Sequence, residues 1–118
     1  MKDRAPKPLT PAVLHILMAL AGGELHGYAI MKQVEQDTGG AMKMGPGTLY
    51  GSISRMMKDA LIAEGETRSD PEMDDARRVY YRLTALGEQA LSDELGRYRA
   101  VLAAAARKKS LRPGTHGG

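Results

Sequence analysis

The sequence predicts a mainly helical α+β fold: a winged helix-turn-helix of order α-α-α-β-β-α with a long C-terminal helix. Three observations predict it. The first half of the chain holds three segments with apolar residues at helical spacing, separated by glycine-containing links. Two runs of alternating, β-type side chains then flank an acidic, turn-rich segment. The last long segment repeats its apolar residues every three or four positions.

Length and composition restrict the class of protein. The chain has 118 residues, which fits one domain. It has no cysteine, so we expect no disulfide and no cysteine zinc site, and a cytoplasmic location fits. No apolar run is long enough to cross a membrane, and the start MKDRAPKPLTP lacks the apolar core of a secretory signal. The net charge of +3 and the pI of about 9.3 mildly favour polyanionic partners.

The first predicted helix follows a flexible basic arm, residues 1–8. Thr10 is a suitable N-cap with Pro11 at the first helical position, and Gly22 and Gly23 end the helix. The segment PAVLHILMAL is apolar nearly all round, so it needs cover on every side, and a second chain is the expected cover. The candidate interface residues here are Val13, Leu14 and Leu17.

The second predicted helix runs from about His26 to Thr38. Its apolar stripe is expected to consist of Tyr28, Met31 and Val34. The short link GGAMKMG then leads to the third helix, and two helices joined by such a glycine-containing link are typical of a helix-turn-helix.

The third helix lies in the stretch GPGTLYGSISRMM (Gly45–Met57), which combines loop residues with helical spacing. A helical wheel places Leu49, Ile53 and Met56 inward. The opposite face carries small residues and the cations Arg55 and Lys58, as a helix that enters a DNA major groove requires.

The start of this helix suits an anion. Pro46 fits the first helical position, because the N–H that it lacks would have no partner there. Gly45 and Gly47 have no side chains, so the backbone can approach a phosphate, which the helix dipole favours. The DNA-binding candidates in this region are Lys43, Pro46, Gly47, Thr48, Ser52, Arg55 and Lys58.

The runs LIAEGET and RRVYYRL predict a two-stranded ribbon, the wing. Val79, Tyr81 and Leu83 share one face of the second strand, and we expect Tyr81 to point inward. The tip carries four carboxylates within 70–75, which DNA phosphates would repel. The better candidates for DNA backbone contact are the arginines at the base, Arg68, Arg77 and Arg78.

The last predicted helix spans 84–109, with Thr84 as its cap, so 9–83 is the DNA-binding domain and 110–118 a disordered tail. Its apolar residues form a seam typical of a coiled coil: Leu91, Leu95, Tyr98, Leu102 and Ala105. The seam could be intramolecular core, but the chain has no other long helix to cover it. A second copy is therefore the expected cover.

Three motifs in this order resemble those of the PadR-type winged-helix transcriptional regulators: LHGYAIMKQVEQDTGG, GPGTLYGSISRMMKDALI and RRVYYRLTALGEQAL. The resemblance covers Leu9 to Ala106 and points to the small subfamily with one C-terminal helix. It implies a homodimer built on the first and last helices, which binds inverted-repeat operators, usually represses, and releases DNA when a small-molecule inducer binds. It also implies that Tyr50 contacts phosphate and that Thr48 and Ser52 face the groove. Some short members bind flat aromatic compounds through tryptophan, and this chain has none.

Other interpretations remain open. Tyr50 could pack on the neighbouring helix, and Arg55 and Lys58 could form an ordinary solvated face. The main alternative function is a winged-helix module that docks a partner protein without binding DNA. An enzyme is not expected, because the histidines have no metal-ligand spacing and GPGTLYGS lacks the lysine of a phosphate-binding loop. No cofactor or metal is expected.

Overall fold

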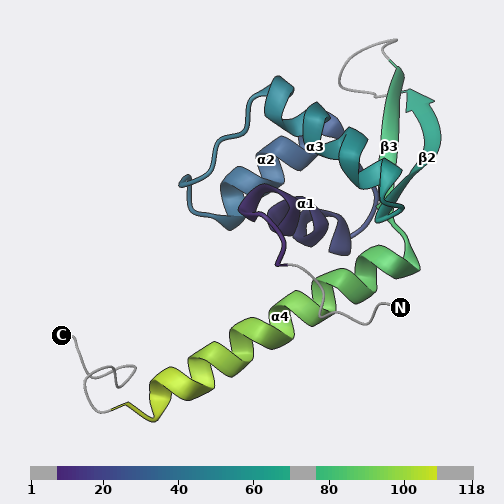
Figure 1. Cartoon of the computed structure of the whole chain (residues 1–118). Coiled ribbons are helices and arrows are strands. Elements are labelled where there is room, and N and C mark those ends of the chain that lie inside the picture. Colours follow the sequence, from purple (N-terminus) through teal and green to yellow (C-terminus); the bar gives the residue numbers. More distant parts are fainter. Residues whose placement is uncertain (1–7, 70–76, 109–118) are drawn as a thin grey trace.

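A computed structural model describes residues 8–69 and 77–108, and it confirms the predicted winged helix-turn-helix (Figure 1). The helices are α1 (Pro11–Ala21), α2 (Gly27–Asp37), α3 (Pro46–Lys58) and α4 (Ala85–Ala106). The strands are β1 (Leu25–His26), β2 (Ile62–Ser69) and β3 (Arg77–Leu83). The first three helices pack together beside the small sheet, and α4 extends away from them. The arm 1–7, the wing tip 70–76 and the tail from 109 lie outside the described residues.

Side chains cap the helices where the sequence indicates. The Thr10 hydroxyl accepts the Val13 N–H at 3.2 Å at the start of α1, and the Thr84 hydroxyl accepts the Gly87 N–H at 3.0 Å at the start of α4. His26 caps α2 through Nδ1, which accepts the Ala29 N–H at 3.2 Å. These bonds satisfy N–H groups that have no partner within the helix, so each helix begins at a defined residue.

The sheet has a third strand that the sequence did not predict. Its order is β1-β3-β2, and both pairings are antiparallel, with Leu25 opposite Tyr81 and Ile62 opposite Leu83. A strand of two residues has no alternation to detect, which is why β1 escaped the pattern analysis. Because β1 leads directly into α2, the sheet holds the start of the helix-turn-helix against the wing.

The core lies between α1 and its neighbours, and it includes three of the residues predicted at the dimer interface. Leu14 and Leu17 are buried within the chain, and Leu91 from α4 joins the same cluster. All three were predicted to contact a second copy, but most of their surface is already covered within one chain, so they contribute to the core of the domain. An all-apolar helix needs cover on every side, and here α2, α3, β3 and α4 contribute it. The prediction that Tyr81 points inward is confirmed.

A tight junction fixes the directions of α3 and α4. Ala60, just after α3, has a left-handed backbone with φ of 62°, and the Leu61 N–H donates to the Met56 carbonyl at 2.9 Å. The Thr84 hydroxyl donates to the Ala60 carbonyl at 2.6 Å, and the Thr84 N–H donates to the Leu61 carbonyl at 3.1 Å. A side chain on Gly87 would clash with the Leu61 carbonyl, so α4 can pack this closely only with glycine there.

The left-handed Ala60 yields a stability prediction. We expect Ala60→Gly to raise the free energy of unfolding by about 0.5–1 kcal/mol, because the steric strain that glycine removes exceeds the chain entropy that it costs on folding. Chemical denaturation measures the change. The matched control is Ala90→Gly inside α4, which should lower stability by about 1 kcal/mol. Equal destabilisation by both substitutions would contradict the prediction.

Candidate nucleic-acid interface

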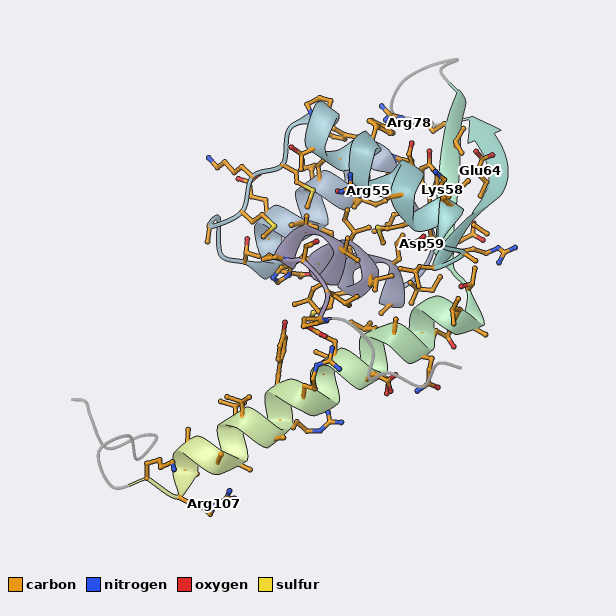
Figure 2. All side chains as sticks on the ribbon, viewed as in Figure 1. Arg55, Lys58, Asp59, Glu64, Arg78 and Arg107 are labelled. Carbon is orange, nitrogen blue, oxygen red and sulfur yellow. The ribbon has the colours of Figure 1, made fainter. Side chains whose placement is uncertain are left out.

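The outer face of α3 is small, polar and cationic, and the inner face is apolar. Leu49, Ile53 and Met56 are buried as the helical wheel predicts. The exposed residues of α3 are Pro46, Gly47, Thr48, Tyr50, Gly51, Ser54, Arg55 and Lys58. Figure 2 labels Arg55 and Lys58 on this helix, with Arg78 on β3. The structure therefore brings most of the predicted DNA-facing residues to one surface.

Ser52 is the exception among them. It is only 2% exposed, so the expectation that it faces a DNA groove does not hold in this structure. Positions 49, 52, 53 and 56 follow the spacing i, i+3, i+4, i+7, which places Ser52 within the core-facing stripe. The helical spacing contained this information, but a serine hydroxyl near the start of the helix also suits a DNA contact, and the resemblance favoured that role.

The N-terminal end of α3 has no side-chain cap. Gly45 occupies the N-cap position, Pro46 follows it, and the first turn has no acidic residue. The N–H groups at this end are therefore not satisfied by a side chain of their own helix, and the helix dipole makes the end attractive to an anion. The cations Arg55 and Lys58 lie in the last turn, at the other end.

Tyr50 packs on the neighbouring helix and also remains partly exposed. It is about half exposed, and its hydroxyl end lies directly over Gly27, the first residue of α2. Any side chain at Gly27 would displace the Tyr50 ring. The tyrosine thus packs on the neighbouring helix and still presents an edge to solvent beside the exposed face of α3.

The wing arginines have different surroundings. Arg78 is partly buried; its Nη1 lies 3.5 Å from His26 Nδ1 and its guanidinium 5.8 Å from the centre of the Tyr28 ring. It therefore lies against the start of α2. Arg68 is paired through its backbone with Arg78, and Arg77 with Ser69, but the side chains of Arg68 and Arg77 are outside the described residues.

Lys43, in the link before α3, is exposed. Its Nζ lies 3.9 Å from a carboxylate oxygen of Glu35, and both side chains are largely open to solvent. An ion pair of this kind contributes only about 0–1 kcal/mol. The pair therefore leaves the lysine able to turn toward another anion.

Tyr28 corrects the predicted apolar stripe of α2. It is 51% exposed, and the buried residues of the helix are Gly27, Ile30 and Val34. Lys32 lies one turn further on, with its Nζ 5.4 Å from the centre of the Tyr28 ring. The spacing of four residues between Tyr28 and Lys32 was visible in the sequence. It indicates a cation–π contact only because the Tyr28 ring is exposed rather than buried in the core.

Comparison with known proteins agrees with this geometry. A model of the transcriptional regulator PadR-like family matches residues 16–93, which includes the helix-turn-helix, the wing and the start of α4. The chain belongs to this family. PadR-like proteins are transcriptional regulators built on a DNA-binding winged helix, and neither the family nor the fold is that of an enzyme.

Curated relatives and solved structures extend this finding. The transcriptional regulator Rv3488 of Mycobacterium tuberculosis is 33% identical over 81 residues, which are 69% of each chain. An uncharacterised 37.1 kDa protein in a Streptomyces fradiae transposon is 36% identical over 83 residues, but the chain spans only 21% of its length. A PadR family transcription regulator from Clostridium difficile superposes with a TM-score of 0.69 at 26% identity, over 83% of this chain and 97% of that one.

In this PadR-like chain the apolar seam of α4 divides into two parts. Leu91 is buried and Leu95 partly buried against α1 and the sheet. Beyond them the helix projects from the domain, and Tyr98 and Leu102 are 40% and 66% exposed, with Val101 at 64%. Val13 and Ala105, also predicted at the interface, are partly exposed.

Glu94 is a buried carboxylate that the sequence did not single out. It is 2% exposed and accepts hydrogen bonds from the Tyr98 hydroxyl at 2.8 Å, from the Arg97 guanidinium and from the Leu9 backbone N–H. Burial alone would raise its pKa, but these hydrogen bonds and the Arg97 charge outweigh burial and lower the pKa. The carboxylate thereby holds the chain just before α1 against α4.

The described part of the chain shows neither a metal site nor a membrane span. Among residues 8–69 and 77–108, no group of His, Cys, Asp or Glu side chains is arranged to hold a metal ion. None of the helices in those two ranges has both the length and the apolar character of a membrane-spanning segment.

Glu94 gives a pH-dependent prediction. Because its pKa in the folded protein is below the usual 4.5, its stabilising effect is present above pH 4.5 and disappears as the pH falls through the folded-state pKa. We expect Glu94→Gln to be less stable at neutral pH and to lose stability less steeply below pH 4.5, as measured by urea unfolding at several pH values. Tyr98→Phe should act in the same direction.

The exposed carboxyl Glu64 provides the control for this experiment. Glu64→Gln, which removes one carboxylate from an exposed position, is unfolded at the same pH values for comparison. If Glu94→Gln kept the full wild-type dependence of stability on pH, Glu94 would not be a source of acid sensitivity.

Proposed function

We propose that this PadR-like protein binds an inverted-repeat operator in double-stranded DNA as a homodimer, and that it acts as a repressor that a small-molecule inducer releases. The outer face of α3 carries the proposal. It contains no carboxylate, and it combines exposed small residues with Arg55 and Lys58. Such a face fits a polyanionic groove in both shape and charge.

Each part of the face has a distinct task in the proposal. Gly47 and Gly51 allow α3 to approach the floor of a major groove about 12 Å wide. Arg55 has the planar donor geometry to recognise a guanine, and Lys58 acts as a point charge on phosphate. The uncapped N-terminal end, with Tyr50 beside it, suits a backbone phosphate.

Exposed apolar residues support the dimer. Tyr98, Val101 and Leu102 lie on the projecting half of α4, where they gain stability from being covered. A second copy related by a twofold axis supplies an identical helix as cover. Two recognition helices in such a dimer would read half-sites about 34 Å apart, one turn of DNA.

A cleft supports control by an effector. It has a volume of about 270 Å³ and lies between the end of α1, the end of β3 and α4, with Ala21, Leu83, Leu95 and Arg99 in its lining. A ligand there would bear on the contact between α1 and α4, on which the spacing of the two recognition helices depends. Such a ligand would shift the equilibrium between two arrangements of α1 and α4 only by the difference in its affinity for them. Repression then follows from occupancy of the operator.

Selection of bound sequences from a random duplex pool tests this proposal. We expect a palindromic consensus, and affinity for it should fall steeply and linearly in a plot of log affinity against log salt concentration. Sedimentation should show two copies of the chain. A module that docks proteins instead would show no saturable duplex binding at any salt concentration, and that result would refute the proposal.

Single substitutions on α3 separate base recognition from charge. Arg55→Ala should weaken binding of the selected operator by about 1–3 kcal/mol and relax the preference at one base position. Lys58→Ala should weaken binding to all sequences alike and reduce the salt slope by about one for each phosphate that it no longer neutralises. Arg107→Ala, at the far end of α4, is the control with equal charge change (Figure 2). Unchanged affinity in Arg55→Ala and Lys58→Ala would remove both residues from the interface.

A further inference from the structure

We propose that the outer side of α2 forms a second DNA contact: an open groove that holds the sugar-phosphate strand beside the major groove entered by α3. We call it the α2 groove and define it by Tyr28, Lys32, Glu35, Gln36, Lys43 and Met44. The inference rests on the proposed DNA binding and extends it from Lys43, already a candidate from the sequence, to Tyr28, Lys32 and Glu35, which the sequence analysis did not assign to DNA.

The α2 groove has the form of a shallow track. It has a volume of about 750 Å³ and lies between the exposed side of α2 and the link that leads into α3. Lys32 and Lys43, both exposed, line it from these two elements. Two ammonium groups along an open groove suit a linear polyanion, because they can neutralise successive phosphates without enclosing the ligand.

Tyr28 brings a further cation to one end of this groove. Its exposed ring has the Lys32 ammonium 5.4 Å from its centre and the Arg78 guanidinium 5.8 Å from its centre. The ring therefore lies beside one cation from α2 and one from β3. The positive charge of the groove thereby continues onto the wing.

The groove is also continuous with the face of α3. The Tyr50 hydroxyl end packs over Gly27, one residue before Tyr28, so the two helices present adjoining surfaces. At the other end, Lys43 is two residues before the N-cap of α3, Gly45. In helix-turn-helix complexes the helix that precedes the recognition helix crosses the DNA backbone. Charge complementarity and this continuity together favour a DNA strand over any other occupant.

Glu35 opposes the same contact. It is the acidic residue in the groove lining, and its carboxylate lies 3.9 Å from the Lys43 ammonium. A strand in the groove would have to compete with this carboxylate for Lys43 and would be repelled by it. The geometry therefore requires that removal of the Glu35 charge strengthens DNA binding, which is the opposite of the effect of removing Lys32.

The test measures affinity of the full-length protein for its selected operator, by fluorescence anisotropy across a series of salt concentrations. For each phosphate that Lys32 neutralises, Lys32→Ala should weaken binding to all sequences alike by about fivefold at about 0.15 M salt and should reduce the salt slope by about 0.9. Tyr28→Ala should weaken binding in the same direction, and Tyr28→Phe should retain affinity because the ring remains. Glu35→Gln should strengthen binding and steepen the salt slope.

Lys108→Ala is the matched control, since it removes an equal charge just beyond the end of α4. If the wild type binds its operator but Lys32→Ala and Glu35→Gln both behave like Lys108→Ala, the α2 groove is not a DNA contact, and the proposed function stands. If the wild type binds no duplex, the proposed function fails and the groove contact fails with it. A folding defect in Tyr28→Ala would not affect the test, because the opposite shifts expected of the exposed Lys32 and Glu35 decide it.

Discussion

The hydrogen bonds between Thr84 and the turn at Ala60 and Leu61 determine how the two functional helices are placed. α3 ends at this turn and α4 begins at it, so a few backbone and hydroxyl contacts set the angle between the DNA-facing helix and the projecting helix. Gly87 allows this approach and Ala60 adopts a strained backbone to complete it. In the proposed twofold dimer built on α4, the separation of the recognition helices would depend on this angle as well as on the contact between α1 and α4.

A second set of contacts fixes the positions of α1 and α2 relative to α4 and α3. Glu94 holds Leu9, and therefore the start of α1, against α4, while Tyr50 and Gly27 join the beginnings of α3 and α2. The buried carboxylate is stable because every hydrogen bond that it accepts favours its charged form. Movement between α1 and α4 would therefore have to break or stretch the hydrogen bond between Glu94 and Leu9.

Sequence patterns identified the parts of the protein that depend on local rules. Thr10 and Thr84 cap their helices, and Tyr81 lies inside the sheet as the strand alternation requires. Patterns failed where an apolar or hydroxyl residue suited two different surroundings, the core of the domain or an outer contact, and its sequence neighbours could not distinguish them. Leu14 and Leu17 looked like interface residues because the sequence could not show that the same chain covers them. Ser52 looked like a DNA contact because a hydroxyl is compatible with either side of α3.

By itself the sequence determined the winged helix-turn-helix, its cationic third helix and the family, because helical spacing, capping residues and charge act over a few neighbouring positions. Only the tertiary structure decided which half of the α4 seam is core, that Tyr28 is exposed between two cations, and that Glu94 is buried. These properties depend on which distant segment covers a side chain. That is set by the angle at which whole elements pack, and no local pattern in the chain encodes it.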